Sequence, residues 1–187
     1  MKKQCRARTR LLLRIERFAT RLALSCLLTA LLLSSTFVAA EQSGTSSSAI
    51  LRISGKIEHP MVLRAADLQR LPHKRVTVTD DKGARVTYEG ALVVDLLRSA
   101  GAPLGRRLRG AQMKSYVRVD ASDGYQVIFA LPEFDRDFTD RLILLADKRD
   151  GQPLLAPEGP FRIIVPAEKR HARWVREVID LDVEQAR

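Results

Sequence analysis

The segment of the sequence best equipped for binding chemistry is a basic cluster near the C-terminus. It spans residues 170–174, reads RHARW, and ends on the chain's single tryptophan. Guanidinium groups bind phosphate or carboxylate through paired hydrogen bonds, so Arg170 and Arg173, with His171 between them, predict an anion-binding site. The alternative is a solvated basic segment in which Trp174 fills a gap in the core.

Cysteine is the residue type whose positions restrict the chemistry most. Both cysteines, Cys5 and Cys26, lie within the first forty residues, so residues 27–187 contain none. Thiolate sulfur is the soft ligand that many transition-metal sites require. That part of the chain can therefore offer neither a disulfide nor a protein thiolate to a metal.

Histidine and acidic residues give weaker signals. The three histidines, His59, His73 and His171, lie in separate segments and lack the close spacing of zinc ligands. Residues 132–140 are acidic. We expect them to form a solvated loop rather than to supply a catalytic pair, because no two of their carboxylates stand out for general acid–base work. The sequence therefore predicts no metal centre and names no catalytic residue.

The first forty residues carry the features of an export signal. Eight Lys or Arg and one acid precede an uncharged run from Leu22 to Ala40, which ends in small residues. This order predicts export to the periplasm with cleavage after Ala40. The alternative is a retained anchor, because an apolar run of nineteen residues is long enough to cross a bilayer. An uncleaved signal is the one membrane attachment that the sequence suggests.

The net charge of the chain is +10, but most of it belongs to the predicted signal. The first forty residues contribute +7, which leaves about +3 for the remainder. A strongly basic protein would suggest a nucleic-acid partner, whereas an excess this small does not. We therefore expect no nucleic-acid binding.

Behind the signal, residues 41–48 are rich in Ser, Gly and Thr and predict a flexible leader, and residues 49–187 suit one domain. Strands outnumber helices and do not alternate with them, so we predict an α+β fold with a mixed, mostly antiparallel sheet and a few short helices. The basic segment 104–110 is expected to be a loop, with a short helix as the alternative. Hydropathy patterns predict strands at 49–57, 75–79, 85–88, 116–121, 125–131, 142–146, 161–165 and 178–183, an extended piece at 61–63, and helices at 65–71 and 92–100.

Seven short motifs follow one another in an order that resembles the molybdopterin-binding domain of the sulfite oxidase family. Each motif is weak alone, but together they cover about residues 50–183. The motifs are LRISGKIEHP from Leu51, DLQRLP from Asp67, YEGALVVDLLRSAG from Tyr88, DGY from Asp123, LLADKRDGQPL from Leu144, GPFRIIVP from Gly159 and RHARWV from Arg170.

The resemblance implies a sulfite-oxidase-like fold that holds molybdenum through the dithiolene of a pterin cofactor. Arg170, His171 and Arg173 match the family's anion-binding positions. Arg162 matches an arginine that the family keeps near them. In the family, one protein cysteine completes the metal site, and the resemblance places it in the stretch 100–115, which has no cysteine here.

The motif at Asp123 and Tyr125 allows two interpretations. An Asp-Gly pair between two strand patterns is typical of a hairpin turn. The resemblance also places this motif near the cofactor cleft, which makes Asp123 and Tyr125 candidate pocket residues.

Two functions are compatible with these observations. The first is a non-redox module, without a cofactor, that holds a small anionic ligand or a periplasmic partner protein in the cleft where the family binds its cofactor. The second is a periplasmic molybdopterin-dependent oxidoreductase that binds its cofactor through Arg170, His171 and Arg173. The missing thiolate and the absence of a twin-arginine pair before the apolar run favour the first.

Overall fold

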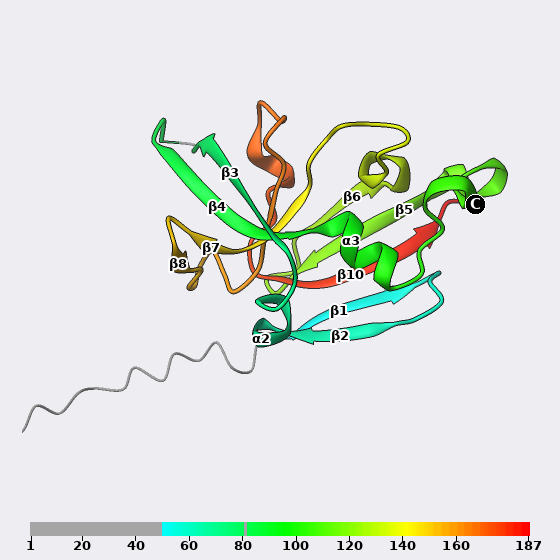
Figure 1. The fold of residues 1–187 in the computed structure, drawn as a ribbon, viewed down its shortest axis with the longest axis horizontal. Coiled ribbons are helices and arrows are strands. Elements are labelled where there is room, and N and C mark those ends of the chain that lie inside the picture. Colours follow the sequence, from blue (N-terminus) through cyan, green and yellow to red (C-terminus); the bar gives the residue numbers. More distant parts are fainter. Residues whose placement is uncertain (1–49, 81) are drawn as a thin grey trace, which may run out of the picture. The chain divides into compact units, whose positions relative to one another are not determined.

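A computed structural model describes residues 50–80 and 82–187, which form two five-stranded sheets (Figure 1). The predicted signal peptide at 1–40 and leader at 41–48 lie outside the described residues. Within the described residues, no helix is both long and apolar enough to cross a membrane.

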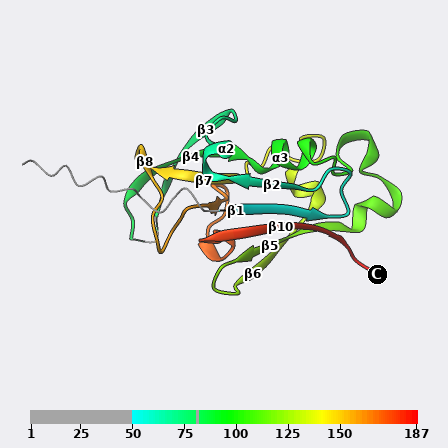
Figure 2. The same cartoon turned by 90° about the horizontal axis from the view of Figure 1, so that it is seen from below.

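The first sheet has the strand order β2-β1-β10-β5-β6, and Figure 2 shows these strands lying one beside the next. Strands β1 and β10 are parallel, and the other neighbours are antiparallel. The strands are β1 (Ile50–Gly55), β2 (Met61–Arg64), β5 (Ser115–Ala121), β6 (Gln126–Ala130) and β10 (Val178–Gln185).

The second sheet is antiparallel throughout, with the order β3-β4-β7-β8 and with β9 paired to β7. Among the strands that the structure describes, β3 pairs with β4 alone. The strands are β3 (His73–Thr79), β4 (Arg85–Leu92), β7 (Leu144–Arg149), β8 (Gln152–Pro153) and β9 (Arg162–Ile164).

The helices of the described chain are short. Helix α3 (Val93–Ser99) buries four apolar side chains and ends before Gly101, whose φ of 75° is the left-handed conformation that favours glycine. The others are α2 (Ala65–Leu68) and the 3-10 helices η2 (Gly105–Arg107), η3 (Gly110–Lys114), η4 (Leu131–Phe134) and η5 (His171–Arg173).

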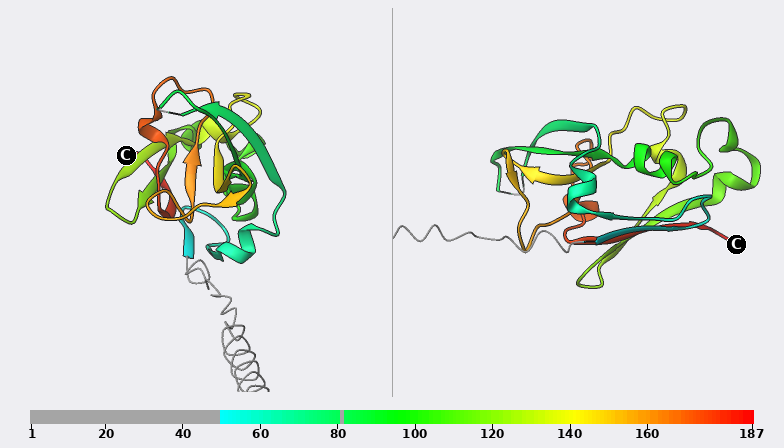
Figure 3. Two further views of the ribbon diagram at one scale, coloured as in Figure 1. Left: turned by 90° about the vertical axis from the view of Figure 1, so that its left-hand side faces the viewer. Right: turned by 60° about the horizontal axis from the view of Figure 1, so that its bottom comes forward.

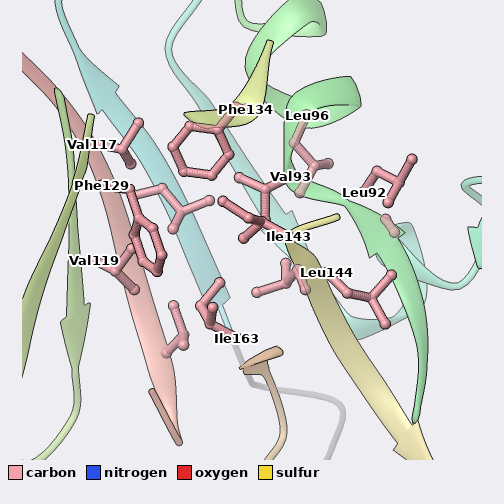
Figure 4. Packing of buried hydrophobic residues seen from close by; sticks show 14 of the residues in the cluster. Leu92, Val93, Leu96, Val117, Val119, Phe129, Phe134, Ile143, Leu144 and Ile163 are labelled. Carbon is pink, nitrogen blue, oxygen red and sulfur yellow. The ribbon is translucent and has the colours of Figure 1, made fainter. Parts of the chain in front are cut away.

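The two sheets enclose a shared apolar core (Figure 4). Val117 and Phe129 of the first sheet project toward Leu144 and Ile163 of the second, and all four are fully buried. The continuous apolar run of β7 is buried on both faces, as its sequence predicts, whereas β5 alternates buried and half-buried positions. Burying side chains of this size stabilises the fold by about 1.5–3 kcal/mol each.

The predicted α+β class with few helices and mostly antiparallel strands is confirmed, with two local corrections. The segment 104–110 contains helix η2 rather than only a loop. The acidic stretch 132–140 is not a wholly solvated loop, because Phe134 and Asp135 are buried. The carboxylate of Asp135 accepts hydrogen bonds from the backbone amides of Gly105 and Asp137, at 2.5 and 3.0 Å. These hydrogen bonds allow the Asp135 side chain to be buried, whereas the sequence pattern predicts that it is exposed to water.

A hydrogen bond between side chains joins β3 to β7 across the intervening strand. His73 Nε2 lies 3.1 Å from the carboxylate of Asp147, whose side chain is 6% exposed, and His73 Nδ1 lies 2.7 Å from the carbonyl oxygen of Leu71. We predict that Asp147→Asn lowers the free energy of unfolding by about 1 kcal/mol, because it replaces a charge-assisted hydrogen bond to a buried carboxylate with a weaker neutral one. Urea denaturation measures the loss. Asp140→Asn, at an exposed position, is the control, and equal stability of the two variants would contradict the prediction.

Candidate functional site

Two adjoining clefts share a wall made by the side chains of His171 and Trp174. The two rings are stacked, with centroids 3.6 Å apart and planes inclined by 19°. The first cleft has a volume of about 450 Å³ and is lined by Ala121, Asp123, Tyr125, Pro157, His171, Ala172, Trp174, Val175, Arg176 and Glu177. The second has a volume of about 600 Å³ and is lined by Thr77, Val78, Thr79, Asp80, Pro166, Glu168, Lys169, Arg170, His171 and Trp174.

Trp174 is held firmly in this wall. Its side chain is buried, and its indole Nε1 donates a hydrogen bond of 3.1 Å to the carbonyl oxygen of Val165, the residue just after β9. Its ring also meets the edge of Tyr88 at a centroid distance of 6.1 Å, in the perpendicular geometry that aromatic pairs favour. Trp174 therefore serves both interpretations of its segment, since it is a core residue and a cleft wall.

Asp123 and Tyr125 both line the first cleft and also build the hairpin turn between β5 and β6. The Asp123 carboxylate accepts a hydrogen bond of 2.9 Å from the backbone amide of Tyr125, as expected for an Asp-Gly turn. The Tyr125 hydroxyl donates to the carbonyl oxygen of Ala172 at 2.8 Å. Tyr125 thereby ties the turn to helix η5, which carries His171.

The second cleft combines basic side chains with carboxylates that already have partners. Lys169 and Arg170 are exposed on its wall, and neither makes an ion pair with another described residue. Asp80 faces Arg149 at 3.1 Å, and a hydrogen bond from the Ala84 amide lowers the pKa of its carboxyl against the opposing effect of burial. Of the described ionisable Lys, Arg, Asp and Glu side chains lining this cleft, Lys169 and Arg170 are the ones left to meet a ligand.

Arg173 does not line either cleft. Its guanidinium is bound by two carboxylates of the protein, Glu133 at 3.1 Å and Glu168, and it lies over the ring of Phe129 at 4.2 Å. Burial raises the pKa of Glu133, but the hydrogen bonds from Arg173 and the Ala130 amide outweigh it and lower that pKa overall. Arg173 was predicted to bind an anion, but its guanidinium already makes its hydrogen bonds to groups of the protein.

Arg162 lies beneath the shared wall rather than in a cleft. Its side chain is 8% exposed, and its Nη1 donates to the Tyr88 hydroxyl and lies 3.0 Å from the Glu158 carboxylate. The guanidinium faces the rings of Tyr88 and Trp174 at 5.5 and 5.9 Å, and its Nε has no hydrogen-bond partner among the described groups. Burial raises the pKa of Tyr88, which keeps its hydroxyl neutral. The structure therefore gives Arg162 a supporting position behind Trp174.

The six predicted site residues thus separate into four groups. His171 lies between the clefts, Asp123 and Tyr125 flank the first cleft, and Arg170 lies on the second, while the remaining two arginines point into the fold. Lys169 and Asp80 were missed by sequence reasoning. Lys169 adjoins the basic cluster and could have been included, whereas only the packing of β3 against the later segment brings in Asp80.

The stretch 100–115, where a cysteine was expected by resemblance, lines neither of the two clefts. It leads into the start of β5, and the Asp123 turn follows the other end of that strand. The clefts themselves also have no cysteine, because residues 27–187 contain none at any position. Among the described residues, no three His, Cys, Asp or Glu side chains gather as metal ligands would.

The fold is similar to that of the sulfane dehydrogenase SoxCD from Paracoccus pantotrophus, with a TM-score of 0.58 and 20% sequence identity. The similar region covers 74% of this chain but 39% of that chain. No curated protein matches the sequence. The sequence pattern of the oxidoreductase molybdopterin binding domain matches residues 40–186, which confirms the resemblance, and the chain belongs to that family.

Proposed function

We propose that this chain is an exported, non-redox member of its family that binds an anionic ligand or a partner at the second cleft. The observation that carries the proposal is the set of donor atoms available. Lys169 and Arg170 present positive charge to the cleft, and residues 27–187 supply no thiolate. Such a cleft can hold an anion by charge and hydrogen bonding without any electron transfer.

The residues present fit only part of the cofactor that the family binds. Arg170 and Lys169 could hold a phosphate, and His171 with Trp174 offers flat ring surfaces beside it. The metal, however, requires a soft protein ligand in the family's arrangement, and no sulfur of cysteine is available beyond Cys26. Arg173, the third expected anchor, is already bound by Glu133 and Glu168.

Family membership itself favours a second candidate, a molybdopterin-dependent oxidoreductase. In that case Arg170 and His171 would orient the cofactor in the second cleft, and the bound cofactor would supply the redox chemistry. Arg173 would contribute by fixing the segment that carries them rather than by touching the cofactor.

Export is part of the proposal. It is supported by the basic start of the sequence, the apolar run from Leu22 and the small residues that end at Ala40. In a Gram-negative host that expresses the full chain, we expect the protein in the periplasmic fraction with Glu41 as its first residue. N-terminal sequencing of the fractionated protein tests this directly.

The deciding experiment is elemental and pterin analysis of the full-length chain, purified from a host that makes the cofactor. We expect no stoichiometric molybdenum by mass spectrometry and no pterin fluorescence after denaturation, because the protein lacks the completing thiolate. A family member that retains a cysteine ligand, expressed in the same host, shows that cofactor was available. Stoichiometric molybdenum lost in Arg170→Ala would overturn the non-redox proposal and support the oxidoreductase.

A further inference from the structure

The second cleft runs along the free edge of β3. Thr77, Val78 and Thr79 all line it, although consecutive residues of a strand point to opposite faces of a sheet. Val78 packs against the core, whereas the hydroxyl of Thr77 lies on the other face, 3.0 Å from that of Thr87. A cleft lined by all three must follow the strand's edge rather than one face.

This edge is one outer side of the second sheet. Among the described strands, β3 pairs with β4 alone, so every second residue directs its backbone N–H and C=O groups away from the sheet. Such an edge is a template for an added strand. Figures 1 and 3 show the segment that carries η5 passing beside this edge, which makes a groove of what would otherwise be open sheet.

The opposite wall of the groove selects by charge. Lys169 and Arg170 are exposed there, while Asp80 and Glu168 are held by arginines of the protein itself, Arg149 and Arg173. The described part of the groove therefore offers backbone hydrogen bonds on one side and unneutralised cations on the other. A small anion would use only the second feature, whereas an extended acidic peptide would use both.

We propose that the second cleft binds an extended, acidic peptide segment of a partner protein, which adds a strand to β3 and places its carboxylates against Lys169 and Arg170. This inference rests on the proposed function and specifies its partner. Main-chain bonds to the edge would supply affinity, and the alternate side chains facing the cations would supply specificity. The three residues of β3 that line the cleft span about 10 Å of strand, which is enough for two or three residues of peptide.

The test uses the full chain and a fluorescein-labelled peptide, Val-Glu-Val-Glu-Val-Glu, with binding followed by fluorescence anisotropy at low ionic strength. We expect saturable binding, and a loss of affinity of about tenfold or more when Lys169→Glu and Arg170→Glu are combined. Arg106→Glu, a reversal at an exposed position on η2, is the matched control and should change the Kd by less than about twofold. Circular dichroism spectra of both variants establish that they are folded.

A second peptide tests the strand pairing itself. The same sequence with N-methyl groups on alternate residues loses the backbone donors, and we expect its affinity to fall about tenfold. Equal affinity of the methylated peptide, complete displacement by inorganic phosphate, equal binding of the Val-Lys counterpart, or no binding at all would overturn the proposal.

Metal analysis on the same preparation separates this inference from the function on which it rests. If the protein lacks molybdenum and still does not bind the peptide, the inference fails and the non-redox proposal stands. If it contains stoichiometric molybdenum in this cleft, the function proposal fails first.

Discussion

Replacing Trp174 with alanine is expected to lower the free energy of unfolding by about 4 kcal/mol, as removal of a buried aromatic side chain does. Trp174 is 3% exposed and packs against Tyr88 and His171, and its indole donates to the Val165 carbonyl. For a domain of this size, the loss corresponds to a decrease in Tm of about 12 °C, measured by differential scanning calorimetry. Because Trp174 forms part of the wall of the second cleft, the same substitution should also abolish the ligand binding proposed there.

A conservative substitution separates packing from hydrogen bonding at this position. Trp174→Phe keeps much of the apolar surface but removes the donor to Val165, so we expect a loss of about 1–2 kcal/mol. Should Trp174→Ala prove as stable as the wild-type protein, Trp174 would be a surface residue, contrary to the packing described here.

Arg173→Ala is expected to cost about 2 kcal/mol of stability, because it removes the cation shared by Glu133 and Glu168 and leaves Glu133 with Arg141 as its remaining cation. The side chains of Arg173, Glu133 and Glu168 are 28%, 25% and 15% exposed, so solvent screens this network only in part. The contact of the guanidinium with Phe129 is lost as well. Chemical denaturation at neutral pH measures the effect, and Arg176→Ala in the same segment, at an exposed position, should cost under about 0.5 kcal/mol.

The pH dependence of the Arg173 effect follows from Glu133. Its pKa is lowered in the folded protein from the ordinary 4.5, so its contribution is fully present above that value and is lost as the pH falls through the lower, folded value. Arg173→Ala removes the principal cause of the lowering. The stability difference between wild type and variant should therefore narrow as the pH falls below about 4.5. A difference that stays constant down to pH 3 or so would contradict the ion-pair account.

The stability of Arg173→Ala and the peptide binding of the Lys169→Glu, Arg170→Glu variant would together decide between the two interpretations of the basic cluster. If Arg173→Ala destabilises the fold while Arg170→Glu with Lys169→Glu affects only binding, the RHARW segment contains one structural arginine and one available for ligand. The sequence treats Arg170 and Arg173 alike, because both have the same chemistry and lie three residues apart. Their difference arises from the partners that the fold brings to each.

The sequence by itself determined the fold class and the family, because local patterns carry that information. The alternation in β5, the continuous apolar run of β7 and the glycine after α3 each specify an element through a local physical requirement. The order of seven motifs then identified the family. The absence of cysteine from residues 27–187 is equally a fact of sequence, and it limits the metal chemistry whatever the fold.

Only the tertiary structure decided which charged residues are available to a ligand. Glu133 lies forty positions before Arg173, and Tyr88 lies 74 before Arg162, so no local pattern predicts that these arginines are taken up by the fold. Equally, the groove exists because β3 is an edge strand and the segment after β9 returns beside it. Long-range pairing sets both features, since the energy of a charge depends on the groups packed around it and not on its neighbours in sequence.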